Sequence, residues 1–147
     1  MIGTFNNEAI SLLAIQSVLS FNPNLNLANI YLITPLLFDK KIRAYFKNKN
    51  TKIISFQDVV TSKSDIFIGF NEKYQDSLIC TTNSIIMGNE LGVFKIVNGR
   101  LIELKKFLDS EKELGIRLDG IFDASKEVAE LLSESTDVIY KLLRLEL

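Results

Sequence analysis

Apolar residues recur at helical spacing through the first third of the chain. Residues 7–20 carry an apolar face so broad that most of this predicted helix must be buried. Pro23 ends the helix, and a second helical stretch begins at about Leu25. Pro35 lies inside this second stretch, where it either kinks the helix or restarts it at a first-turn position. The restarted part, residues 36–48, is amphipathic and its polar side is rich in lysine.

Helical periodicity returns in the middle of the chain. Ser55 is suited to cap a short helix that runs through Val60. Residues 65–91 follow a helical pattern again, either as one helix or as two that meet near Ser77. The side chains expected to be buried there are the large apolar ones: Phe67, Phe70, Tyr74, Leu78, Ile79, Ile85, Ile86 and Leu91.

The clearest local signal is an Asn-Gly dipeptide between two short apolar runs. Residues 93–97 and 100–104 each suit a β-strand, and Asn98 and Gly99 lie between them. Both central residues of a type I′ turn need positive φ, which Asn and Gly adopt readily. The pattern therefore predicts a β-hairpin.

Two more helices are expected after the hairpin. One starts at Asp123 or Ser125, and the other is capped by Thr136 and runs to the end. Several helices followed by a tight hairpin form the order of a winged-helix domain, in which the hairpin is the wing. We therefore expect one domain over residues 1–147, mainly α with a small antiparallel β-hairpin, winged-helix-like with two appended C-terminal helices.

The last predicted helix has apolar residues on two faces. One stripe at helical spacing is expected to pack on the domain: Val138, Leu142 and Leu145. The other apolar residues still have surface to cover and are the candidate partner-binding residues: Ile139, Tyr140, Leu143 and Leu147. An uncovered patch of this kind tends to mark an interface. The alternative is that both faces are buried in the domain's own core.

Charges are unevenly distributed, although the formal net charge is only −1. Residues 36–52 contain six cations and one anion, whereas residues 103–137 contain ten acids and five bases. The candidate electrostatic contacts are the first four cations of the basic stretch: Lys40, Lys41, Arg43 and Lys47. They could contact an acidic partner surface or a nucleic acid backbone, or they form only a solvated face.

The chain lacks most of the residues that catalysis and metal binding use. It has no histidine and a single cysteine, Cys80, which excludes a Ser-His-Asp or Cys-His arrangement within the chain and a cysteine-based zinc site. Asp119 and Asp123 lie four residues apart, which a solvated helix start explains better than a metal site. Cys80 is interpreted as a small buried hydrophobe. We expect no catalytic, cofactor-binding or metal-ligating residues, and we expect that the chain is not an enzyme.

Three features indicate a cytoplasmic protein. The lone cysteine excludes an internal disulfide, the first residues lack the basic region and cleavage site of a signal peptide, and no apolar run approaches the roughly 20 residues of a membrane span.

DNA binding is the alternative that a winged-helix order suggests, since the helix before the hairpin would enter the major groove. Residues 69–87 carry Lys73 against Glu72 and Asp76, and no arginine. They lack the cations that supply most affinity for phosphate. A stand-alone winged-helix DNA-binding transcriptional regulator is therefore the alternative, and not the leading, interpretation.

Several short segments, in this order and spacing, resemble a known family. They are residues 5–9 (FNNEA), 30–38 (IYLITPLLF), 70–74 (FNEKY), 82–86 (TNSII), 124–126 (ASK) and 139–143 (IYKLL). Together they are similar to the small middle component of bacterial three-component ABC-ATPase systems, which is related to the small accessory subunit of Lamassu-type anti-phage defence. The chain departs from the family pattern at Asn7, where the family usually has proline, and at Asp39, where it often has histidine.

The resemblance implies a non-catalytic accessory subunit. Such a subunit bridges an SMC/Rad50-like ATPase and an effector, often a nuclease, and helps to hold the effector inactive until foreign DNA is sensed. The resemblance implies these two protein partners and leaves DNA contact through the complex open. The residues themselves indicate no membrane, no small-molecule substrate and no cofactor.

Overall fold

The computed structural model describes residues 2–50, 52–105 and 116–145, and for residues 2–6 and 116–119 it describes the backbone alone. The described chain is mainly helical with a small three-stranded antiparallel sheet. Its helices are α1 (Ile2–Phe21), α2 (Leu27–Ile30), α3 (Ile33–Phe38), α4 (Lys40–Lys47), α5 (Phe56–Ser62), the 3₁₀ helix η1 (Ser64–Phe67), α6 (Phe70–Glu90), α7 (Ile116–Leu131) and α8 (Thr136–Leu142). Its strands are β1 (Leu25–Asn26), β2 (Phe94–Val97) and β3 (Arg100–Glu103).

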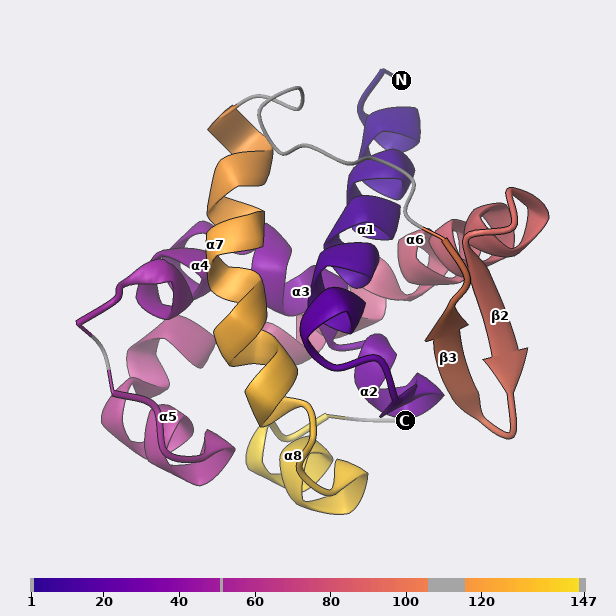
Figure 1. The fold of residues 1–147 in the computed structure, drawn as a ribbon. Coiled ribbons are helices and arrows are strands. Elements are labelled where there is room, and N and C mark those ends of the chain that lie inside the picture. Colours follow the sequence, from indigo (N-terminus) through magenta and orange to yellow (C-terminus); the bar gives the residue numbers. More distant parts are fainter. Residues whose placement is uncertain (1, 51, 106–115, 146–147) are drawn as a thin grey trace.

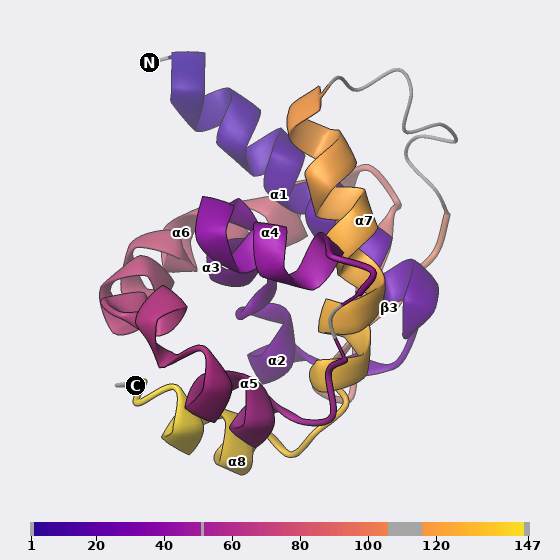
Figure 2. The same cartoon turned by 90° about the vertical axis from the view of Figure 1, so that its left-hand side faces the viewer.

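Helix α3 lies at the centre of the helical part. It contacts α1, α4, α6 and α7, and every residue from Ile33 to Leu37 is buried. Figure 1 shows α1 and α7 side by side, with α6 passing behind α1 and the hairpin at one edge. The view turned by 90° shows α4 lying against α7, with α5 and α8 packed together at the base (Figure 2).

The broad apolar face predicted near the N-terminus is confirmed. Every residue from Ser11 to Leu19 is buried, because α1 packs between α6 and α7. The helix begins at Ile2, five residues before the predicted start.

The second predicted helical stretch is wrong at its beginning. Leu25 and Asn26 form strand β1, which pairs antiparallel with Leu101 and Arg100 of β3. Periodicity could not show this pairing because the partner strand lies about 75 residues further along the chain. Pro35 lies in the first turn of α3, as the restart interpretation predicted. The restarted stretch is not one helix over residues 36–48, because α3 ends at Phe38 and Asp39 caps a separate helix, α4.

The hairpin is confirmed. Phe94 pairs with Glu103 and Val97 with Arg100. Asn98 has φ 53° and Gly99 has φ 74°, as a type I′ turn requires. Strand β1 adds to β3, so the sheet order is β1-β3-β2.

Helix α6 is continuous from Phe70 to Glu90, with no break at Ser77. Three of the side chains expected to be buried in this region are exposed, which corrects that expectation: Ile79, Ile86 and Leu91. Hydroxyl residues share the inward side with the buried Phe70, Tyr74 and Ile85. Thr81 donates a hydrogen bond to the Thr34 hydroxyl at 3.0 Å, and Ser84 donates to the Glu8 carbonyl at 2.8 Å.

The C-terminal helices begin elsewhere than predicted. Helix α7 starts at Ile116, ahead of the predicted Asp123 or Ser125. Ser135 occupies the cap position of α8, and the Thr136 hydroxyl donates to the Asn29 side chain of α2 at 2.8 Å. Among the described helices, none is both long and apolar enough to cross a membrane.

Candidate functional site

The lysines of α4 point outward because its apolar residues hold the opposite side against the core. Asp39 caps the helix, accepting a hydrogen bond from the Ile42 amide at 2.9 Å. Ile42 and Phe46 are buried where α4 packs on α7. The remaining side of the helix exposes three of the four predicted electrostatic residues: Lys40, Lys41 and Lys47. No carboxylate of the described residues lies within ion-pair distance of them.

Arg43, the fourth predicted residue, lies in a different environment. It is half-buried, and its guanidinium donates a hydrogen bond to the Leu37 carbonyl at 2.8 Å. Its side chain crosses Gly120 of α7, where an added Cβ would lie 3.2 Å from Nε. Arg43 therefore joins α3, α4 and α7, and its placement separates it from the exposed lysines.

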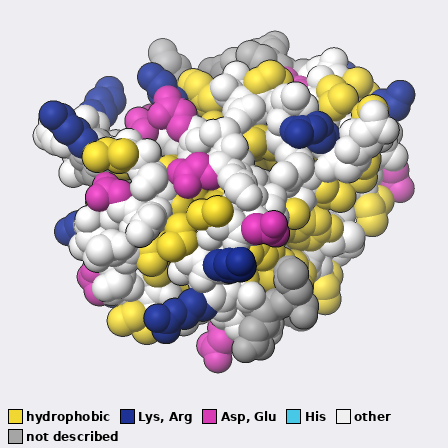
Figure 3. All heavy atoms as spheres, turned by 90° about the horizontal axis from the view of Figure 1, so that it is seen from below, with side chains coloured by type: hydrophobic (Ala, Val, Ile, Leu, Met, Phe, Trp, Pro, Cys, Tyr) yellow, Lys and Arg dark blue, Asp and Glu magenta, His cyan; other side chains and the backbone are white. Residues whose placement is uncertain are grey.

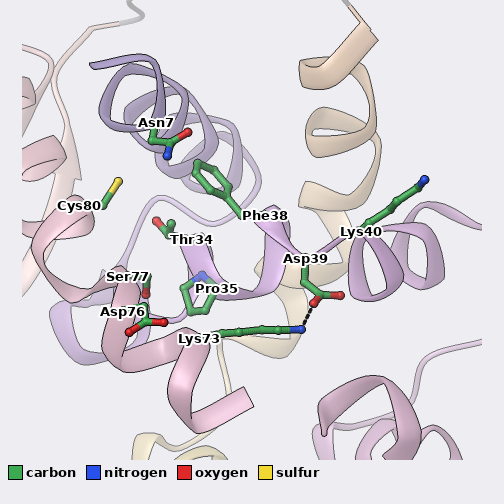
Figure 4. Close-up of a pocket in the computed structure, with 10 residues that line it drawn as sticks. All are labelled: Asn7, Thr34, Pro35, Phe38, Asp39, Lys40, Lys73, Asp76, Ser77 and Cys80. Carbon is green, nitrogen blue, oxygen red and sulfur yellow. Dashed lines mark hydrogen bonds and ion pairs between the residues drawn. The ribbon is translucent and has the colours of Figure 1, made fainter. Parts of the chain in front are cut away.

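A pocket of about 420 Å³ opens between α1, α3, α6 and the start of α4. Figure 4 shows Lys73 extending from α6 to form an ion pair with Asp39, while Lys40 points away from the pocket. The lining combines a few apolar side chains with polar and charged ones: Asn7, Thr34, Pro35, Phe38, Asp39, Lys40, Lys73, Asp76, Ser77 and Cys80.

The ion pair with Lys73 helps to lower the pKa of Asp39. Burial by itself would raise the pKa of this carboxyl, but the hydrogen bonds from Lys73 and the Ile42 amide, with the charge of Lys73, outweigh it and lower the pKa. Asp39 therefore stays ionised to a lower pH than an ordinary aspartate. The stability that this pair contributes is present above the unfolded pKa of about 3.9 and is lost as the pH falls through the lowered folded value.

Cys80 lines this pocket but is not activated as a nucleophile. Burial and the negative charge of Glu8 raise the pKa of the thiol, and hydrogen bonds with Ser11 and Ser84 only partly offset them. The side chain is half-buried, so the prediction of a buried small hydrophobe holds only in part.

The expectation of an uncovered apolar face on the last helix is wrong for the residues that the structure describes. Ile139, Tyr140 and Leu143 are all buried, with Ile139 fully enclosed. Leu147, the fourth candidate, lies outside the described residues. Helix α8 turns this side toward the core and packs on α5. The stripe that was expected to pack inward is the more exposed one: Val138 is 48% exposed, and Leu142 and Leu145 are half-buried.

Tyr140 has a structural environment. Its hydroxyl donates to the Ala28 carbonyl at 2.6 Å, and the Tyr74 hydroxyl lies 3.3 Å from it. The two rings meet edge to face with centroids 5.7 Å apart. Burial, together with Tyr74, raises the pKa of Tyr140 far above its ordinary value. Tyr140 therefore links α8 to α2 and α6. Seen from below the view of Figure 1, the surface shows charges of both signs among apolar patches (Figure 3).

Sequence reasoning missed the pocket. The Asp39–Lys73 pair joins residues 34 positions apart, and only the cap by Asp39 had a local signal, an aspartate before a lysine-rich helix. Within the described ranges, no group of three or more cysteine, aspartate or glutamate side chains is placed to hold a metal ion.

Comparison with known proteins places the chain in one family. Residues 14–147 match the family described as ABC-three component (ABC-3C) system Middle Component 3. The chain matches no curated protein and no solved structure. Members of this family work with an ABC ATPase and other components. Since the match covers most of its length, the chain belongs to the Middle Component 3 family of ABC-three component systems.

Proposed function

We propose that this protein is a non-catalytic accessory subunit that binds the ABC ATPase of its system and a further component. The family match over residues 14–147 is the observation that carries the proposal. In the finer form of the proposal, the ATPase is SMC/Rad50-like, the further component is an effector nuclease, and the system is of the Lamassu anti-phage type. The segments that resemble the middle component, from residues 5–9 to residues 139–143, support this form through the relation of that component to the Lamassu accessory subunit.

The side-chain inventory supports the non-catalytic part of the proposal. The chain has no histidine, and the thiol of Cys80 has a raised pKa. In the pocket, the charged groups of Asp39 and Lys73 pair with each other. Partner binding needs none of these groups to react.

The proposal also includes a winged-helix-like architecture. Strand β1 lies between α1 and α2, and it joins the hairpin at β3 to give the order β1-β3-β2. A winged helix has this arrangement, with α6 in the position of the recognition helix. Helices α4 and α5 and the 3₁₀ helix η1 are then insertions before α6.

Co-expression of the tagged chain with the ATPase and the third component tests the proposal. We expect both proteins to copurify with the chain, and the purified chain alone to turn over neither ATP nor DNA in the presence of Mg²⁺ or Mn²⁺. A chain that elutes free of both components contradicts the accessory role. Turnover that persists through repurification contradicts the non-catalytic role.

A further inference from the structure

The outward side of α6 exposes two isoleucines in one row. Ile79 is 75% exposed and Ile86 is 51% exposed. They lie seven residues apart on a continuous helix, so they face the same side about 10 Å from each other. Isoleucine is not among the best helix formers, so helix propensity does not explain its use at these exposed positions.

The inward side of the same helix makes this placement more informative. Thr81 and Ser84 are fully buried there, while the isoleucines face outward. Phe70, Tyr74 and Ile85 are buried on the inward side as well, so that side already supplies the contact of α6 with its own domain. The two outward isoleucines are not needed for that contact, and exposed apolar side chains that gather in one row are typical of an interface with another molecule.

Acidic residues flank the isoleucines along the same side. The row consists of exposed residues at alternating spacings of three and four, and we name it the α6 row: Glu72, Asp76, Ile79, Asn83, Ile86 and Glu90. Its spacing is that of a helix–helix seam. At 1.5 Å per residue, it extends for about 27 Å.

A shallow hollow of about 190 Å³ adjoins the row between α6 and α1. Glu8, Asp76 and Ile79 line it together with Asn7 and Cys80. Glu8 also accepts a hydrogen bond from Asn83 at 3.1 Å. Burial and, after it, the negative charge of Glu8 raise the pKa of the Cys80 thiol.

The charge of this surface selects the chemistry of its partner. Lys73 lies beside the row, but its ammonium group pairs with Asp39. The row and its hollow therefore present carboxylates around an apolar centre, which suits cations and opposes a nucleic acid backbone. A second copy of this chain would offer the basic helix α4, but its outward side adds only Ala44 to the lysines and lacks a large apolar residue.

We propose that the α6 row is a docking surface for an amphipathic α-helix of a partner protein, which presents apolar residues to Ile79 and Ile86 and lysine or arginine to the flanking acids. The inference rests on the proposed function in needing a protein partner, and it adds the surface and the chemistry of that contact.

Two sets of variants of the full chain test the docking surface. Ile79→Glu with Ile86→Glu removes the apolar centre. Ile54→Glu with Val138→Glu is the control, because these side chains are 83% and 48% exposed and lie outside α6, before α5 and on α8. Each variant is co-expressed with the ATPase and the third component, and circular dichroism verifies that it is folded. We expect the row variant to lose at least ten-fold in copurified partner and the control to retain wild-type yield.

Charge reversal tests the chemistry of the partner. Glu72→Lys, Asp76→Lys and Glu90→Lys together should weaken the same complex ten-fold or more at low salt. Three exposed acids elsewhere supply the control, changed to lysine in the same way: Asp123, Glu130 and Asp137.

The outcomes separate the inference from the proposed function. A wild-type complex that both row variants form equally well overturns the docking surface and leaves the accessory role standing. If the isoleucine variant loses the partner and the charge-reversal variant keeps it, the partner does not present lysine or arginine to the row. Loss of DNA binding or of self-association, with the protein complex intact, also overturns the inference. A wild-type chain that binds no component counts against both proposals.

Discussion

Asn29 is buried in α2, and its side chain links that helix to the turn between α7 and α8. Its amide nitrogen donates to the carbonyls of Leu132 at 2.7 Å and Glu134 at 3.1 Å, and its oxygen accepts from Thr136. The last carbonyls of a helix have no partner within the helix. A single side chain therefore satisfies the end of α7 and holds the start of α8.

Replacing Asn29 should lower the stability of the fold by far more than the size of its side chain suggests. Asn29→Ala leaves two carbonyls without their partner and opens a small void, so we expect a loss of about 2–4 kcal/mol in the free energy of unfolding. Urea unfolding followed by circular dichroism measures it. Asn24→Ala, at an exposed site before β1, is the control and should change stability by less than about 0.5 kcal/mol. Equal stabilities for the two variants would contradict this role of Asn29.

Cys80 provides a pH-dependent test at the same scale. The raised pKa means that less thiolate is present at any given pH, so alkylation by iodoacetamide should be slower in the folded chain than in urea. The rate profile of the folded chain should be displaced to higher pH. The unfolded chain is an internal control because it contains the same single cysteine. A rate profile of the folded chain that coincides with that of the unfolded chain, or lies at lower pH, would contradict the raised pKa of Cys80.

Among the elements, α8 shows how strongly the effect of a substitution on stability can differ between adjacent residues. Ile139 is fully buried, while Val138 next to it is 48% exposed. Ile139→Asp places a charge in the core and should lower stability by about 3 kcal/mol or more, whereas Val138→Asp should change it by less than about 1 kcal/mol. Thermal melting of the two variants measures the difference. A tolerated Ile139→Asp would restore the prediction that this face is free to bind a partner.

Helix α4 has an equally clear division between exposed and structural cations. We expect reversal of Lys40, Lys41 and Lys47 to glutamate to weaken assembly or DNA engagement by the complex, most strongly at low salt, with unchanged melting. Arg43→Ala should instead lower the melting temperature, because it removes the hydrogen bond to Leu37 and the packing over Gly120. Pull-down at several salt concentrations, with melting curves, tests both. If the triple reversal binds like wild type at every salt concentration, the lysines form only a solvated face.

At the scale of the whole molecule, the features predicted correctly were those with local causes. The hairpin follows from Asn98-Gly99, the helix at Phe56 from the Ser55 cap, and the buried first helix from its broad apolar face. Strand β1 has a distant cause, because only its pairing with β3 makes Leu25 and Asn26 extended. The inward face of α8 depends likewise on α5 and Tyr74, which no pattern within α8 contains.

The candidate site divides in the same way. The exposure of Lys40, Lys41 and Lys47 follows from the amphipathic pattern of their own helix. The pocket, the Asp39–Lys73 pair and the place of Arg43 over Gly120 all depend on contacts between elements remote in sequence. Exposed Ile79 and Ile86 were misassigned because apolar character alone does not indicate which side of a helix is covered.

The most direct test of the accessory role is sedimentation of the purified chain mixed with the purified ABC ATPase of its own system. The account predicts a single faster boundary that contains both proteins and saturates as the chain is added. Two separate boundaries at every ratio and salt concentration, with both proteins folded and with nucleotide present or absent, would contradict it.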